Sequence, residues 1–163
     1  VINEVLIDGD PDATEEFVEL VNTSDEPLNL AGVELLSNRG AKLVPRVTFR
    51  KGCLPGHGAI AMYADPARWV WTPEATQPVE YDLERFGFPN HVDFHFSLRS
   101  VAGTVIDLFR GPASGIREGE SLNRSPDVKG GFLSRHTRLS SARRSPGYSV
   151  NGRSYRQELR TEK

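Results

Sequence analysis

The chain has 163 residues, of which 37% are hydrophobic and 26% are charged, and its formal net charge is −2. This length suits one domain with a single core, and no run approaches the roughly 18 apolar residues that a membrane-spanning helix needs. Cys53 is the single cysteine, which excludes an internal disulfide and a zinc site built from several cysteines. Fifteen glycines and eleven prolines favour short strands joined by turns.

The first part of the chain alternates short apolar runs with turn residues. Five segments have the length and composition of strands, namely residues 2–7, 17–21, 33–37, 46–49 and 59–63. Residues that favour turns, chiefly Gly, Pro, Asp and Asn, separate these segments. Strands at this spacing are typical of a β-sandwich or a barrel.

The regular spacing of strands breaks between residues 65 and 91. We expect one helical turn after Asp65, because Asp can cap a helix and Pro66 suits the first helical position. A long loop is expected beyond that turn, and a loop of such length is often functional or packs as a lid over the core. Packing is the favoured prediction for Trp69 and Trp71, and partner binding by these two residues is the alternative.

A β-hairpin is predicted after this inserted loop, with strands at residues 92–98 and 104–109. Val92, Phe94, Phe96 and Leu98 are expected to face inward, because apolar and polar residues alternate along the first of these strands. Beyond residue 111 the chain is rich in loop residues and in arginine. Residues 151–163 are polar, and we expect them to fray or to form a marginal helix.

Charge is distributed unevenly along the chain. Residues 1–100 contain 8 Lys/Arg and 16 Asp/Glu, a balance of −8, whereas residues 101–163 contain 12 and 6, a balance of +6. If the two parts lie side by side in one domain, their charges largely neutralise each other. The alternative is that the second part presents a basic binding face.

Five segments occur in an order that resembles the lamin tail domain family. They are INEVL at 2–6, EFVELVN at 16–22, LNLAGV at 28–33, GESLNRSPD at 119–127 and SPG at 145–147. The resemblance implies an immunoglobulin-like β-sandwich, and it is closer to the bacterial forms, which are accessory modules of secreted or surface-anchored proteins, than to nuclear lamins. It brings no shared catalytic residues, and the chain has no coiled-coil rod.

We therefore predict an all-β chain with an immunoglobulin-like β-sandwich at residues 1–150, a long inserted loop at about residues 65–91, and a polar tail at residues 151–163. The predicted function is that of a non-catalytic binding or structural module with a protein or cell-surface partner. We expect the chain to be a piece of a larger extracytoplasmic bacterial protein. Binding of nucleic acid or another polyanion is one alternative, and a calcium-dependent surface module is another; no other cofactor is expected.

Acidic residues crowd the loop before the second strand, at Asp8, Asp10 and Asp12. Together with Glu16 and Glu19 they match five ligand positions of an EF-hand, but the central glycine is missing and strands flank the loop. An EF-hand is therefore not expected. A looser calcium site within Asp8, Asp10 and Asp12 is predicted as an alternative to an acidic, solvent-exposed turn.

His91, Asp93 and His95 alternate in sequence, so a strand would place all three side chains on one face. Histidine and carboxylate are ordinary zinc ligands, and Asp107 on the returning strand can add a fourth. A strand with apolar residues inside and polar residues outside explains the same alternation without a metal.

Arginines gather toward the end of the chain, and the predicted polyanion-binding residues are Arg124, Arg135, Arg138, Arg143 and Arg144. Few aromatic residues lie among them, so stacking on bases has little support. Pairing with the acidic first part of the chain is the alternative for these arginines.

Overall fold

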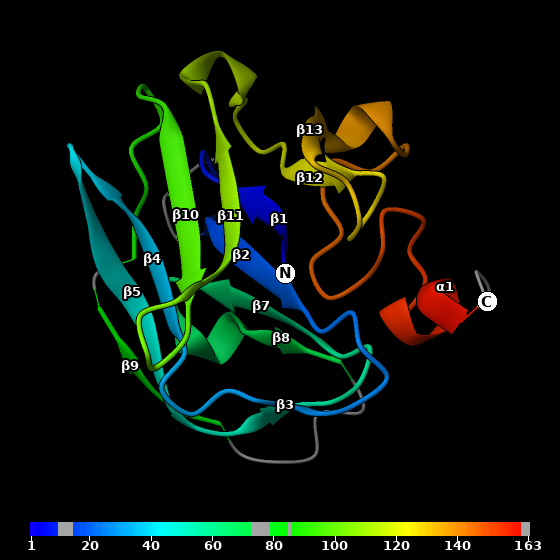
Figure 1. Ribbon diagram of the computed structural model, residues 1–163. Helices are drawn as coiled ribbons and strands as arrows, with labels where there is room; N and C mark the ends of the chain where they lie inside the picture. Colours follow the sequence, from blue (N-terminus) through cyan, green and yellow to red (C-terminus); the bar gives the residue numbers. More distant parts are fainter. Residues whose placement is uncertain (10–14, 73–78, 85, 161–163) are drawn as a thin grey trace.

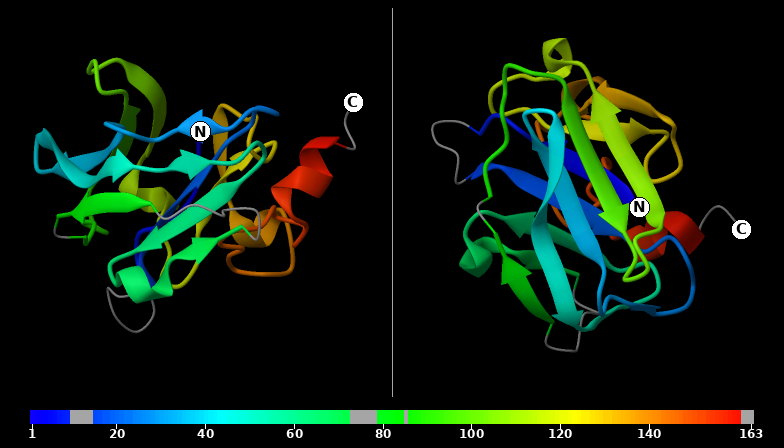
Figure 2. Two further views of the ribbon diagram at one scale, coloured as in Figure 1. Left: turned by 90° about the horizontal axis from the view of Figure 1, so that it is seen from below. Right: turned by 60° about the vertical axis from the view of Figure 1, so that its left-hand side comes forward.

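The computed structural model describes residues 1–9, 15–72, 79–84 and 86–160, and most of its regular structure is β-strand (Figure 1). Two large antiparallel sheets form the body of the molecule, and their layers are seen in the right-hand view of Figure 2. The prediction of an all-β sandwich is confirmed.

Six strands form the first sheet. In spatial order they are β13 (Phe132–Arg135), β12 (Leu122–Ser125), β1 (Ile2–Leu6), β2 (Phe17–Val21), β7 (Ala59–Tyr63) and β8 (Val70–Trp71). β1, β2 and β7 are fully buried along their length, and the polar residues Asn3, Glu4 and Glu19 are buried in β1 and β2 together with their apolar neighbours. β12 and β13 form in the part of the chain that was predicted to be mainly loop.

Five strands form the second sheet. In spatial order they are β11 (Val105–Gly111), β10 (Phe94–Arg99), β4 (Glu34–Arg39), β5 (Lys42–Lys51) and β9 (Glu80–Leu83). A small separate sheet pairs β3 (Leu28–Asn29) with β6 (Cys53–Leu54). The helical elements are the 3₁₀ turns η2 (Pro66–Arg68), η3 (Ala113–Gly115) and η4 (His136–Arg138), and the helix α1 (Tyr155–Arg160). None of the helices in the described ranges is long and apolar enough to cross a bilayer.

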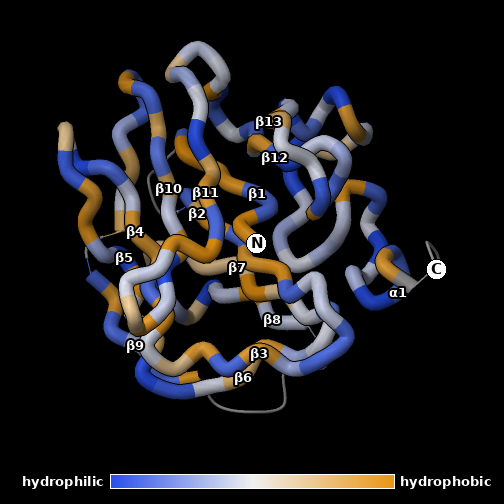
Figure 3. The backbone as a smooth tube through the Cα atoms, in the orientation of Figure 1, coloured by the Kyte–Doolittle hydropathy of each residue, from blue (hydrophilic) through white to orange (hydrophobic). Residues whose placement is uncertain are grey.

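The hydrophobic core lies between the two large sheets, and Figure 3 shows apolar stretches along β1, β2 and β7. Phe96, Leu98 and Phe109 enter it from the second sheet. The predicted alternation in β10 is therefore correct from Phe94 onward. The prediction that Val92 faces inward is wrong, because Val92 precedes the strand and is exposed.

The segment at residues 65–91 contains more regular structure than the predicted loop. η2 forms after Asp65, whose carboxylate accepts a hydrogen bond from the Ala67 amide at 2.9 Å, as expected for a capping residue. β8 then extends the first sheet and β9 extends the second. Backbone pairing at both sheet edges therefore holds this insert in place.

Trp69 packs in the core and is only 8% exposed. Its Nε1 donates a hydrogen bond to the carbonyl of Tyr63 at 2.8 Å, and its ring stacks on Tyr81 with centroids 4.1 Å apart. Trp71 is half-buried beside it, with ring centroids 6.0 Å apart. Trp69 is therefore used in packing, which was the favoured prediction, and it is too buried to bind a partner. Partner binding by Trp71 stays a prediction.

Arg124 joins the two large sheets. Its Nη2 lies 2.7 and 2.8 Å from the two carboxylate oxygens of Asp107 in β11 and donates to the Leu108 carbonyl at 2.9 Å. Nε and Nη1 donate to the carbonyls of Ile2 and Gly130 at 2.7 and 2.9 Å. The prediction that Arg124 binds polyanions is wrong, because the side chain is buried and its donors are engaged within the fold.

Two buried glutamates anchor the end of the chain to the first sheet. Glu4 and Glu19 are paired across β1 and β2, and both are 0% exposed. Glu4 accepts hydrogen bonds from the Ser145 amide and hydroxyl, each at 3.0 Å. Glu19 accepts bonds from the Gly147 amide and the Tyr155 hydroxyl, each at 2.6 Å. Burial raises the pKa of both glutamates above its ordinary value.

The predicted tail is therefore helical at residues 155–160 and docked onto the sandwich (Figure 1). Tyr155 and Leu159 form a second apolar cluster with Val21, Ala59 and Val128. A helix of six residues has little stability by itself. Its structure here follows from tertiary contacts made by one tyrosine and one leucine.

Candidate functional site

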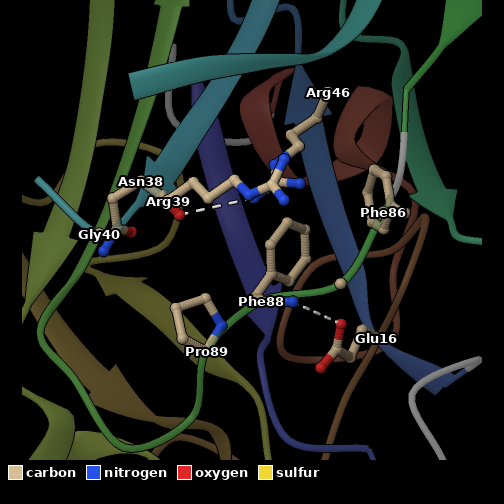
Figure 4. A pocket seen from close by; sticks show the side chains of 9 residues that line it. Glu16, Asn38, Arg39, Gly40, Arg46, Phe86, Phe88 and Pro89 are labelled. Carbon is tan, nitrogen blue, oxygen red and sulfur yellow. Dashed lines mark hydrogen bonds between the residues drawn. The ribbon is translucent and has the colours of Figure 1, made fainter. Parts of the chain in front are cut away.

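A pocket of about 420 Å³ opens beside the β4–β5 hairpin, and it is the candidate functional site (Figure 4). Three segments build it: the residue before β2, the hairpin with the start of β5, and the segment between β9 and β10. Its lining residues are Glu16, Asn38, Arg39, Gly40, Arg46, Phe86, Gly87, Phe88 and Pro89. We call it the hairpin pocket.

Arg46 forms the buried cationic wall of the hairpin pocket. Its Nε donates to the Ser37 hydroxyl at 2.6 Å, and its guanidinium carbon lies 6.0 Å from the centroid of the Phe88 ring. A guanidinium at this distance is attracted by the negative face of an aromatic ring. These two contacts fix Arg46 against the pocket while Arg39 lines the same space from an exposed position.

Glu16 lies on the other side of Phe88, as Figure 4 shows. Its carboxylate accepts a hydrogen bond from the Phe88 amide at 2.9 Å, and the residue is 5% exposed. Burial raises the pKa of Glu16 to about 7, and the negative charge of Asp8 adds to the rise, while the Phe88 amide and Arg46 oppose it. A carboxyl group in this range changes its charge near neutral pH.

We expect titration of Glu16 to be visible in the stability of the protein. The folded-state pKa of about 7 lies above the ordinary value of 4.5, so the folded state holds the proton more tightly than the unfolded chain. The contribution of Glu16 to the free energy of unfolding therefore falls as pH rises from about 4.5 to about 7. Carbon-detected NMR of the carboxyl group should give this pKa directly.

The Glu16→Gln variant isolates this effect, because other buried carboxyl groups titrate in the same direction. The difference in urea stability between wild type and Glu16→Gln should change across that pH range, whereas Glu26→Gln, at an exposed turn, should follow wild type. A Glu16 pKa near 4.5 would contradict the prediction.

The hairpin pocket offers recognition chemistry. The guanidinium groups of Arg39 and Arg46 line it together with the Glu16 carboxyl group. The rings of Phe86 and Phe88, with centroids 4.8 Å apart, offer an apolar wall. Among the described lining residues, Glu16 carries the single carboxyl group. Guanidinium groups and aromatic rings in one pocket suit an anionic group attached to a flat apolar body.

The predicted metal-binding histidines do not come together. β10 begins at Phe94, so His91 and Asp93 precede the strand and only His95 lies in it. Asp93 accepts a hydrogen bond from the Ala113 amide at 3.0 Å, and the proposed fourth ligand, Asp107, is paired with Arg124. Within the described ranges no three His, Cys, Asp or Glu side chains converge to hold a metal ion. The zinc prediction for His91, Asp93 and His95 is wrong for this reason.

The predicted calcium loop is described only at its start. The Asp8 carboxylate accepts a hydrogen bond from the Asn90 side chain at 2.9 Å. Asp10 and Asp12 lie outside the described residues. Glu16 and Glu19, which would complete an EF-hand register, are instead buried against Phe88 and Tyr155.

The arginines near the end of the chain differ in their contacts. Arg144 forms an ion pair with Glu15 at 2.8 Å, which fits the predicted pairing with the acidic first part of the chain. Arg143 donates to the Glu118 carbonyl, and Arg135 donates to the carbonyls of Ser114 and Gly115 at 3.3 and 3.4 Å. Arg138 is exposed, and in the described part of the chain no hydrogen bond or ion pair engages its side chain.

Sequence reasoning missed Arg46, Phe86 and Phe88 as site residues. Phe86 and Phe88 lie in the insert that breaks the strand spacing, which is the signal that could have pointed to them. No sequence signal pointed to Arg46. The β4–β5 pairing shifts its register between Leu35 and Leu36, and this shift alters which side chains of the two strands lie on the same face. In comparisons with known proteins, no family model matches the chain, and a search of curated proteins returned no match.

Proposed function

We propose that this chain is a non-catalytic binding module and that the hairpin pocket is its ligand site. The observation that carries the proposal is the placement of Arg46 and Glu16, both nearly fully buried, on either side of Phe88 in the wall of an open pocket. Burying two ionisable side chains at a pocket costs folding free energy. Such groups are commonly retained where they serve recognition.

A small carboxylate with a flat apolar body fits this arrangement best. Its anionic group would lie near Arg39 and Arg46, and its apolar face would lie against Phe86 and Phe88. A guanidinium binds a carboxylate through paired N–H donors. Protonated Glu16 repels no anion, so binding should strengthen as pH falls below about 7.

The proposal is tested by an NMR titration with benzoate as the probe and benzyl alcohol as the neutral counterpart. Benzoate should shift the amide resonances of Gly40, Gly87 and Phe88, and benzyl alcohol should bind more weakly. Arg39→Ala should weaken benzoate binding by several-fold, since an exposed cation is removed without disturbing the core. Arg138→Ala is the matched control. Equal benzoate binding by Arg39→Ala and Arg138→Ala would overturn the proposal. Benzoate-induced shifts of amide resonances outside the pocket would do the same.

We also propose that the chain is a lamin-tail-like domain with an immunoglobulin-like sandwich, placed outside the cytoplasm as part of a larger bacterial protein. The order of its sequence motifs supports this relationship. An antibody against the domain should label intact cells of the source bacterium without permeabilisation, and labelling that requires permeabilisation would contradict the placement.

The two alternative functions have less support. Polyanion binding at the basic end would rest on Arg135, Arg138 and Arg143, since Arg124 and Arg144 are engaged in ion pairs. Calcium binding would rest on Asp8, with Asp10 and Asp12 outside the described residues. Heparin binding that weakens with salt would favour polyanion binding. A melting temperature that rises with calcium would favour calcium binding.

A further inference from the structure

The exposed side of β10 and β11 forms a second distinctive surface, separate from the hairpin pocket. We call it the outer β10–β11 face. It contains His95, Ser97 and Arg99 of β10 and Val105, Leu108 and Arg110 of β11. These residues share one face because they are direct partners in the sheet: His95 with Arg110, Ser97 with Leu108, and Arg99 with Val105. The right-hand view of Figure 2 shows both strands on the outside of the molecule.

Apolar side chains are exposed along this face. Eight large hydrophobic residues are exposed in the described part of the chain, and four of them fall between residues 101 and 108: Val101, Val105, Ile106 and Leu108. Exposed apolar residues that gather in one place, unlike scattered ones, are a mark of interaction sites.

Polar groups on the same face lack partners although water does not reach them. His95 Nε2, Ser97 Oγ and Arg99 Nε are all shielded, and the structure gives none of them a hydrogen bond within its described residues. Ser97 is 0% exposed. Buried polar atoms are almost always paired in folded proteins, so three unpaired ones along one strand are unusual. His95 and Arg99 are partly exposed, which leaves these two residues within reach of another molecule.

The charge of this face favours an acidic group near Arg110. Neither Arg99 nor Arg110 forms an ion pair with a carboxylate of the described ranges, and Glu34 lies across from Arg99 in β4. The pKa of His95 is lowered, first by burial and then by the charges of Arg110 and Arg99. A hollow of about 430 Å³ lies beside Arg110 and His95 and is also lined by Asp93, Phe94 and Gly111.

We propose that the outer β10–β11 face docks a segment of a partner protein that carries acidic and aliphatic side chains together. A carboxylate of the partner would enter the hollow and pair with Arg110, while its aliphatic side chains would cover Leu108 and Val105. Acceptors of the partner would approach the partly exposed guanidinium of Arg99. A polyanion would not use the apolar residues, and a purely apolar partner would leave Arg110 buried without a counter-charge.

The test is selection of a random peptide library displayed on phage against the protein. The selected peptides should combine Asp or Glu with Leu, Ile or Val. A synthetic peptide from the selection should bind Arg110→Glu at least about tenfold more weakly, because an attraction becomes a repulsion. Leu108→Ser should also weaken binding several-fold. Both positions are exposed, so neither change should affect folding, and Arg138→Glu is the matched charge control.

Four outcomes would overturn the proposal. Peptides without acidic or without aliphatic residues would do so, as would peptide binding that Arg110→Glu leaves unchanged. Heparin binding that depends on Arg110 but not on Leu108 would identify a polyanion surface instead. A dimer in sedimentation that Leu108→Ser abolishes would identify a second copy of the chain as the occupant.

Discussion

Replacing Arg124 with alanine is expected to lower the free energy of unfolding by about 3–5 kcal/mol, which is the usual cost of removing one partner of a buried ion pair. The change would leave the Asp107 carboxylate between the sheets without its guanidinium partner. It would also remove the donors that satisfy the carbonyls of Ile2, Leu108 and Gly130. Urea denaturation monitored by tryptophan fluorescence gives this number.

Two variants bracket the Arg124 prediction. Arg124→Lys keeps the charge but loses the planar fork that serves the Asp107 carboxylate and three backbone carbonyls at once, so an intermediate loss of stability is expected. Arg138→Ala, at an exposed arginine, should change stability by no more than about 0.5 kcal/mol. If Arg124→Ala lowers the free energy of unfolding by less than about 1 kcal/mol, the contacts of Arg124 between the two sheets are not important for stability.

Tyr155→Ala is expected to lower the free energy of unfolding by about 3–5 kcal/mol, as is typical when a large buried aromatic side chain is truncated. The ring packs against Val21 and Val128, and the hydroxyl bonds to Glu19 and to the Tyr148 carbonyl at 2.6 and 2.7 Å. Since α1 depends on this contact, hydrogen exchange should speed up throughout residues 145–160.

Matched tyrosine variants separate the ring from its hydroxyl. Tyr155→Phe keeps the packing and leaves Glu19 without one partner, so about 1–3 kcal/mol should be lost. Tyr148→Ala removes an exposed ring, and its backbone carbonyl remains to accept the bond from Tyr155. Stability close to wild type is expected for Tyr148→Ala. Unchanged exchange at residues 145–160 in Tyr155→Ala would contradict the docking role of this residue.

The central strands were predictable because their pattern is local. Residues 17–21 and 59–63 are strands with the predicted bounds, and β10 differs by only a few residues from its prediction. β8, β9, β12 and β13 were missed. Each of these is an edge strand or lies next to one. A short segment at a sheet edge becomes a strand because the adjacent strand offers unpaired backbone N–H and C=O groups.

The candidate sites were less predictable than the strands. The sequence placed Glu16 and Glu19 in an EF-hand-like register with Asp8, although an EF-hand was not expected, and it grouped Arg124 with the other late arginines as a surface. In the folded chain Glu16, Glu19 and Arg124 are all buried in different surroundings. Proximity in sequence misled for Arg124, because side chains on successive strand positions point to opposite faces and their partners come from distant segments.

The sequence alone determined the all-β class, the central strands and the position of the insert, because alternating polarity and turn residues act over a few positions. Only the tertiary structure decided which ionisable residues are buried and what surrounds them. Glu19 and Tyr155 are far apart in the sequence, as are Arg46 and Phe88. A pattern that extends over a few residues therefore cannot predict that the members of each pair are in contact. Sheet pairing and register bring these residues together, and the proposed ligand pocket and docking face follow from that pairing.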